Sequence, residues 1–135
     1  MKRGQARELL MQLLFQMSFH EDFHISMKEK FLEEYELDTQ EEYFSDALGV
    51  FMMHKDEIDR LISENLRKWK IERIPKVDLA ILRVAIAEIR YMDNIPDSVS
   101  INEAVELAKK FGEEDSGKFI NGILGKIVND GNENP

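Results

Sequence analysis

The sequence predicts an all-α protein of about seven helices, and three observations support this. Apolar residues recur at spacings of three and four along most of the 135 residues. No segment shows the strict alternation of apolar and polar residues that is typical of a half-buried strand. Hydrophobic residues make up 43% of the chain, which is enough for the core of one compact domain. We therefore expect residues 1–135 to form a single helical domain.

The first half of the chain contains four helical patterns. A helix is expected over residues 4–19, where one apolar stripe contains Ala6, Leu9, Leu10, Leu13, Leu14 and Met17. A second is expected over residues 26–36, with Met27, Phe31 and Tyr35 facing inward. Asp38 or Thr39 can cap a third helix, and a fourth follows from about His54. The boundary near residues 53–55 is left open, since the last two could be one bent helix.

A fifth helix is expected to be the most buried one. Pro75 suits its first turn, where a backbone N–H is not needed. Twelve of the sixteen residues from 77 to 92 are apolar, so other helices must cover most of its sides. Arg83 within this run is expected to be a buried, paired structural residue.

The segment from residue 100 to 124 contains two helix starts and one helix end. Ser100 and Glu103 have the spacing of a capping box, so a helix is expected to begin there. It is expected to end at Phe111, with Gly112 as a left-handed cap. Asp115 or Ser116 can cap the last helix, before a frayed polar tail over residues 129–135.

The start of the last helix is also a potential anion site. Its free N–H groups and dipole attract negative charge, and Lys109, Lys110 and Lys118 are close in sequence. The alternative is that Asp115 and Ser116 only cap the helix. Glycines at 117, 122 and 125 suggest close approach of another helix, or less often of a ligand or partner.

Composition and charge limit the possible functions. The chain has no Cys, and its apolar runs do not exceed four residues, so we expect a cytoplasmic protein without a membrane span. The net charge of −9 disfavours nucleic acid in general, but the first seven residues carry three bases and no acid. A second basic run surrounds Trp69; it could grip single-stranded nucleic acid, although a solvated helix end with a buried Trp is the preferred interpretation.

One catalytic motif occurs in the sequence, and we do not expect it to function. His20, Glu21 and His24 match the zinc-protease pattern, but the match straddles the expected end of the first helix. A solvated loop is the preferred interpretation. Phosphate loops, nucleophile elbows and nucleotide-binding fingerprints are absent from the sequence. We expect no enzymatic activity, no metal or other cofactor, and no small-molecule substrate.

An ordered series of short motifs resembles the NusB family of bacterial transcription antitermination factors. The motifs extend over essentially the whole chain. They are Gln5-Ala6-Arg7-Glu8 with Gln12 and Phe15, Asp78-Leu79-Ala80-Ile81-Leu82-Arg83-Val84-Ala85, Glu88, Ile95-Pro96, Ile101-Asn102-Glu103-Ala104, Phe111-Gly112, Asp115-Ser116 and Phe119-Ile120-Asn121-Gly122.

The resemblance implies a fold, partners and site residues. The fold would be two three-helix groups around a shared core, with an N-terminal half of about 1–70 and a C-terminal half of about 71–135. The partners would be boxA-type single-stranded RNA and the ribosomal protein NusE, within a complex that contains other Nus factors and RNA polymerase. The implied RNA-binding residues are Lys2, Arg3, Arg7, Phe111, Asp115, Ser116, Lys118 and Phe119. Phe15 and Asp78 would contact the protein partner.

Alternatives remain for several of these residues. Core packing would equally explain Phe15, Phe111 and Phe119, and Asp78 could simply stabilise the start of its helix. The N-terminal segment is poor in arginine for this family, so we expect weak RNA binding by the isolated protein. A helical scaffold that binds no RNA is the alternative function. The RNA hypothesis requires the basic N-terminus to lie beside the bend before the last helix.

Overall fold

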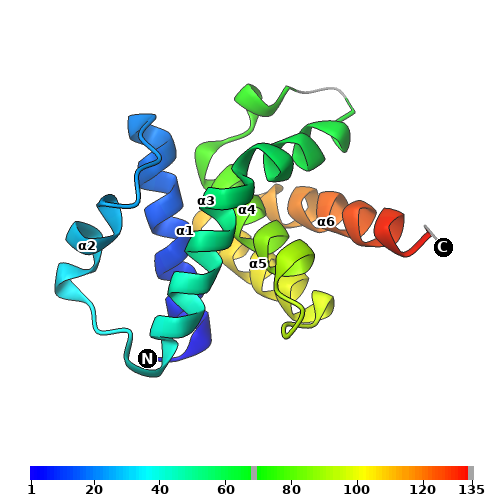
Figure 1. Cartoon of the computed structure of the whole chain (residues 1–135). Helices are drawn as coiled ribbons and strands as arrows, with labels where there is room; N and C mark the ends of the chain where they lie inside the picture. The colour runs from blue at the N-terminus through cyan, green and yellow to red at the C-terminus, as the bar shows by residue number, and fades with distance from the viewer. Residues whose placement is uncertain (68–69, 134–135) are drawn as a thin grey trace.

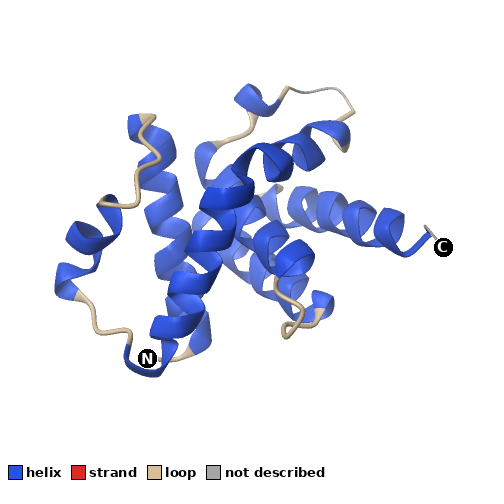
Figure 2. Cartoon of the chain, in the orientation of Figure 1, coloured by secondary structure: helices blue, strands red, loops and turns tan. Residues whose placement is uncertain are grey.

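The computed structural model describes residues 1–67 and 70–133, and these residues contain six α-helices and no strand (Figure 2). The helices are α1 (Arg3–His20), α2 (Met27–Phe31), α3 (Glu41–Glu64), α4 (Lys76–Tyr91), α5 (Asp97–Phe111) and α6 (Ser116–Glu133). Short 3-10 turns cover Leu32–Glu34, Asp38–Gln40 and Ile71–Arg73. The all-α prediction is confirmed. None of the helices described is both long and apolar enough to cross a membrane.

Helix α4 lies at the centre of the molecule and contacts α1, α3, α5 and α6 (Figure 1). Eleven of its sixteen residues are buried, as the apolar run from 77 to 92 predicted. The predicted stripe of α1 is buried as well, and the core contains residues from α1, α3, α4, α5 and α6. Helices α1 to α3 come from the N-terminal half and α4 to α6 from the C-terminal half, and both sets share this core.

Helix α3 is one bent helix. His54 has φ −115° and ψ 20°, which interrupts the helical geometry at the boundary that the sequence left open. One helix therefore replaces two of the expected seven. The α3 helix ends at Glu64. The basic run around Trp69 includes Lys68 and Trp69, which lie outside the described residues.

Helix α2 is shorter than predicted. It ends at Phe31, and a 3-10 turn over Leu32–Glu34 leads to Tyr35 in an extended conformation. Tyr35 is 43% exposed, so the expectation that it faces inward is wrong. The change from a helical to an extended backbone removes the spacing on which that expectation rested.

The capping predictions around α5 are wrong in detail. The helix begins at Asp97, and Ser100 lies inside its first turn with its hydroxyl bonded to Glu88. Gly112 follows Phe111 as predicted, but its φ of −91° is not left-handed. A Cβ at Gly112 would lie 2.6 Å from Ser116 Oγ and 2.8 Å from the Ala108 carbonyl oxygen. Close approach of neighbouring atoms, not a positive φ, therefore requires glycine at this position.

Helix α6 begins at Ser116, one of the two predicted starts, but it is longer than expected. Residues 129–133 are helical, so the prediction of a frayed tail is wrong there, and residues 134–135 lie outside the described part. The expected close helix contact at the glycines is also wrong. Within the described part of the chain, a Cβ at Gly122 or Gly125 would meet nothing within 4 Å, and one at Gly117 would make only ordinary contact, 3.7 Å from Val105 Cγ1.

Candidate nucleic-acid interface

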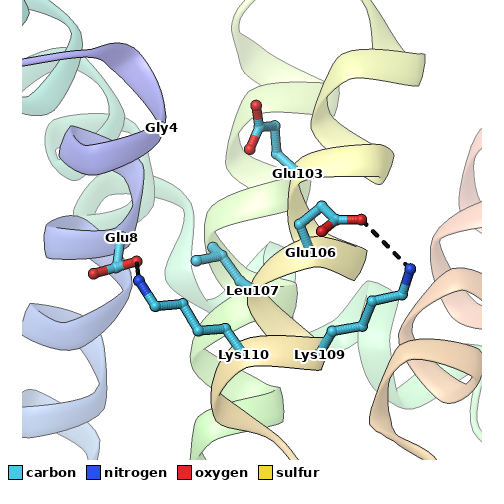
Figure 3. A pocket seen from close by; sticks show the side chains of 7 residues that line it. All are labelled: Gly4, Glu8, Glu103, Glu106, Leu107, Lys109 and Lys110. Carbon is cyan, nitrogen blue, oxygen red and sulfur yellow. Dashed lines mark hydrogen bonds and ion pairs between the residues drawn. The ribbon is translucent and has the colours of Figure 1, made fainter.

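The N-terminal part of α1 lies beside the C-terminal part of α5. Lys110 Nζ donates to Glu8 Oε1 at 2.8 Å and joins the two helices. A shallow pocket of about 390 Å³ extends along this boundary from Gly4 to Lys109 and Lys110 (Figure 3). We call this surface the α1–α5 seam; its lining residues are Gly4, Glu8, Glu103, Glu106, Leu107, Lys109 and Lys110. The seam thus extends from Gly4, next to the basic N-terminal segment, to Lys110, two residues before the bend at Gly112.

Three lysines in and next to the seam can reach an anion. Lys109 and Lys110 have side chains that are 66% and 63% exposed, and Lys118 is exposed in the first turn of α6. Lys109 pairs with Glu106 at 3.4 Å and Lys110 with Glu8 (Figure 3). Exposed ion pairs of this kind contribute at most about 1 kcal/mol, so a phosphate can compete for either ammonium.

The first residues bend toward the start of α3. Lys2 is exposed, and the exposed Arg3 donates from Nε to Gln40 Oε1 at 2.5 Å. The Arg3 guanidinium also lies 4.4 Å from the centroid of the Tyr43 ring. The amino terminus is 3.7 Å from Asp38 Oδ2. The two basic side chains are therefore accessible at one end of the seam.

Arg7 is buried beneath the seam. Its Nε and Nη2 donate to the two carboxylate oxygens of Glu88 at 2.7 and 3.1 Å, and Nη1 is 3.7 Å from Glu103. Burial alone would lower the pKa of Arg7, but the hydrogen bond and charge of Glu88 raise it overall. Because the Arg7 side chain is 3% exposed and already bound, it presents no accessible surface to a phosphate, contrary to the expectation of a direct RNA contact.

Glu88 is the centre of a network that links four helices. Its carboxylate also accepts hydrogen bonds from Tyr43 Oη at 2.5 Å and Ser100 Oγ at 2.8 Å. Burial and then the charge of Glu88 raise the pKa of Tyr43, which keeps the phenol protonated as a donor. Sequence reasoning missed Glu88 and Tyr43 as organising residues. The available signal was an acidic residue within the apolar run of α4.

Arg83 of α4, a second buried base, is paired as predicted. Its Nε and Nη2 each donate to one carboxylate oxygen of Asp59 at 2.9 Å, and the side chain is 6% exposed. The guanidinium also lies over the Phe23 ring, 5.2 Å from its centroid. These contacts fix the bend of α3 against α4 and leave Arg83 no accessible face for a phosphate.

Asp78 and Ser116, which were expected on the protein-partner surface and the RNA surface respectively, are hydrogen-bonded to each other. Ser116 Oγ donates to Asp78 Oδ2 at 3.0 Å and accepts from the backbone N–H of Glu113 at 2.9 Å. Both side chains are buried, while Asp115 next to them is exposed. Burial raises the pKa of Asp78, the Ser116 hydrogen bond opposes this, and Glu113 adds to the increase. The other oxygen, Asp78 Oδ1, is buried and has no hydrogen-bond partner among the residues that the structure describes.

The aromatic residues divide into exposed and packed ones. Phe111 is 36% exposed, and the Lys110 ammonium lies 5.2 Å from its ring centroid. Phe119 is half-buried and packs against the core. On α1, half-buried Phe15 stacks with Phe19 at 6.3 Å between centroids, and Phe19 is 63% exposed. Phe19 was not among the predicted site residues, although it lies one turn after Phe15.

The zinc-protease pattern does not form one helical face. Helix α1 ends at His20, and Glu21 has a left-handed φ of 53°. His24 lies beyond this turn, with Nδ1 at 2.8 Å from Ser26 Oγ. In the part of the chain that the structure describes, no three His, Cys, Asp or Glu side chains are grouped so as to hold a metal ion.

These features define an all-helical binding domain. A buried Arg-Glu-Tyr-Ser network fixes its helices, and exposed cations and aromatic rings lie on the surface above it. The network and the seam both depend on α1, α4 and α5 meeting at Glu88.

Comparison with known proteins gives the family. The model of the NusB family matches residues 4–129. A transcription antitermination protein NusB of Bacillus mycoides is 50% identical over 130 residues, which cover 94% of this chain and 97% of that protein. A solved structure of T. maritima NusB is 36% identical, with a TM-score of 0.86, and the match covers 96% of this chain and 92% of that chain. This chain belongs to the NusB family.

A solved complex is also similar. It is a crystal structure of the antitermination factors NusB and NusE with double-stranded RNA. The matching chain is 25% identical, with a TM-score of 0.86, and the match covers 95% of this chain and 96% of that one.

Proposed function

We propose that this chain acts in transcription antitermination by binding boxA-type single-stranded RNA together with NusE. Other Nus factors and RNA polymerase would complete the complex. Full-length similarity to NusB proteins supports this, as does similarity to a NusB chain solved with NusE and RNA. The observation that carries the RNA part is the α1–α5 seam, where exposed Lys109 and Lys110 of α5 lie beside Gly4 and Glu8, next in sequence to the exposed Lys2 and Arg3.

The proposed RNA surface has an exposed layer and a buried layer. The exposed layer would contact phosphates and bases; it consists of Lys2, Arg3, Lys109, Lys110, Phe111, Asp115 and Lys118. The buried layer would hold those residues in place through Arg7, Ser116 and Phe119. Lys109 and Lys110 enter this set because they are accessible in the seam.

The isolated protein should bind RNA weakly. Glu8, Glu103 and Glu106 line the same seam as Lys109 and Lys110, so its lining has one more acid than base and attracts a phosphate only weakly. Each phosphate neutralised on a single strand contributes about 0.7 to the slope of log affinity against log salt concentration. NusE would add contacts that the lone chain lacks.

The RNA proposal is tested by Lys110→Ala with Arg60→Ala as the matched control. Both side chains are exposed, at 63% and 64%, and both form a surface ion pair, at 2.8 and 2.9 Å. Fluorescence anisotropy with boxA-type RNA, with and without NusE, should show weaker binding and a salt slope reduced by about 0.7 for Lys110→Ala only. Equal behaviour of the two variants would instead support the helical scaffold without RNA. A double-stranded RNA in parallel shows which form is preferred.

The NusE surface is proposed to include Phe15, Phe19 and the region of Asp78. The stacked pair on α1 is the larger apolar element there, and truncating the exposed Phe19 leaves the core intact. Phe19→Ala should weaken NusE binding at least tenfold in calorimetry, as expected for loss of an aromatic anchor. Val99→Ala, which also removes an exposed apolar side chain (41% exposed), is the control. Unchanged NusE affinity of Phe19→Ala would exclude this surface.

A further inference from the structure

A separate groove lies between α3 and the C-terminal end of α4. Its volume is about 530 Å³, and it shares no residue with the α1–α5 seam. Gly49, Val50 and Met53 of α3 and Met92 after α4 form its apolar part. Asp46 on one side and Asp93 on the other are acidic. The groove therefore has an apolar floor between two carboxylates.

The apolar floor contains two residues that the fold itself does not explain. Met53 is 80% exposed in the middle of α3. A flexible, polarizable Met on a surface adapts well to the side chains of a partner. Gly49 is also in the middle of α3, where glycine lowers helix stability relative to alanine, yet a Cβ there would meet none of the described residues within 4 Å. Packing within the chain does not require glycine, whereas a closely approaching partner would.

One end of the groove is already rigid in the free chain. His54, at the bend of α3, stacks face to face on Tyr91 at 3.9 Å between ring centroids. Tyr91 Oη donates to Glu57 Oε2 at 3.0 Å, which holds the ring from α3. A preformed wall lowers the entropic cost of binding, since few side chains have to be ordered.

The charge of the groove selects the partner. Among the described residues, the charged side chains that line it are Asp46 and Asp93, and both are exposed. A lysine reaches its edge, where Lys28 Nζ donates to Ser45 Oγ at 2.7 Å. Nucleic acid would be repelled by the two carboxylates, whereas a cationic segment would be attracted.

We propose that this groove is a second docking surface, which binds a basic amphipathic helical peptide of a partner protein. Apolar side chains at helical spacing would pack on Val50 and Met53, and flanking Lys or Arg residues would pair with Asp46 and Asp93. The surface lies apart from the seam, so RNA and this peptide can bind the same molecule. The proposal does not rest on the RNA or NusE assignments.

The test uses the full chain labelled for NMR and a defined probe peptide. The probe is a short helix with Leu at helical spacing and four flanking Lys, and its control has Glu in place of Lys. The Lys peptide should shift amide signals in residues 45–53 and 91–94, and the Glu peptide should not. Asp46→Lys with Asp93→Lys should weaken binding at least tenfold. A matched double reversal at other exposed acids, Glu33→Lys with Glu114→Lys, should change it less than threefold.

Gly49→Leu separates the surface from the fold. Because a Cβ at this position meets none of the described residues within 4 Å, and Leu favours a helix more than Gly does, the variant should have a thermal midpoint at least as high as that of the wild type while losing the peptide-induced shifts. The proposal is overturned if the groove signals do not respond to the Lys peptide, if both charge-reversed pairs bind equally, or if RNA shifts the groove instead. Sedimentation of the wild type and of Met53→Glu tests whether a second copy of this chain occupies the groove. A wild-type dimer that Met53→Glu dissociates would also overturn the proposal.

Discussion

Replacing Glu88 with Gln should be one of the most damaging single changes in this protein. The substitution keeps the shape of the side chain and removes its charge. Glu88 is fully buried and accepts hydrogen bonds from Arg7, Tyr43 and Ser100. The Glu88 carboxylate has two acceptor oxygens, whereas a Gln amide has one acceptor oxygen and one NH₂ donor. The NH₂ group would therefore face donor groups and could not accept their hydrogen bonds. Arg7 would keep its charge without a full partner.

The size of the expected stability loss follows from the burial of the Arg7 and Glu88 side chains. The Arg7 side chain is 3% exposed and that of Glu88 is fully buried, so water cannot replace the lost contacts. Removing one partner of a buried ion pair costs about 3–5 kcal/mol. Domains of this kind are stable by about 5–15 kcal/mol, so the variant should fold with a strongly reduced margin. At about 3–4 °C per kcal/mol for a chain of this length, the thermal midpoint should fall by roughly 10–20 °C.

Urea unfolding followed by circular dichroism measures this loss. Glu106→Gln is the control, because Glu106 also forms an ion pair, with Lys109 at 3.4 Å, but is 68% exposed, and it should lose less than about 1 kcal/mol. In a double-mutant cycle, Arg7→Met combined with Glu88→Gln should cost less than the sum of the single changes, by about 2 kcal/mol. If the double variant is too unstable, Ser100→Ala should lose about 1 kcal/mol through one missing donor.

A small effect would refute the reasoning. If Glu88→Gln loses no more stability than Glu106→Gln, the four-helix network does not hold the fold together. A coupling energy near zero between Arg7 and Glu88 would mean that their bidentate contact contributes little in solution.

Two further predictions concern glycine and Asp78. Gly112→Ala should destabilise the protein by about 1–3 kcal/mol, because its Cβ would overlap Ser116 and Ala108. Gly122→Ala should instead stabilise it by up to about 1 kcal/mol in the same urea assay. Similar values for the two variants would contradict the close packing around Gly112. Burial raises the pKa of Asp78, so the ionised carboxylate costs stability at neutral pH, and this cost disappears as the pH falls through the raised pKa. The stability of wild type relative to Asp78→Asn should therefore increase as the pH is lowered from 7 toward about 4, the ordinary value of the group, and a flat difference would exclude the shift.

Much of the fold could be predicted because helix periodicity is local. The stripe of α1 and the apolar run of α4 identify the buried faces without knowledge of their neighbours. The start of α6 at Ser116 and the end of α5 at Phe111 also follow from nearby residues. Local signals failed where a distant group competed. Ser100 has the spacing of a cap, but its hydroxyl binds Glu88, twelve residues earlier in the chain.

The site shows the same division more strongly. The sequence alone indicated a basic N-terminus, lysines near the last helix and an antitermination family, because composition and motif order are properties of the chain itself. Only the tertiary structure decided that Arg7 is buried against Glu88 while Lys110 is accessible beside Glu8. Exposure and pairing depend on residues as much as 102 positions apart, and the packing of α1, α4 and α5 brings them together.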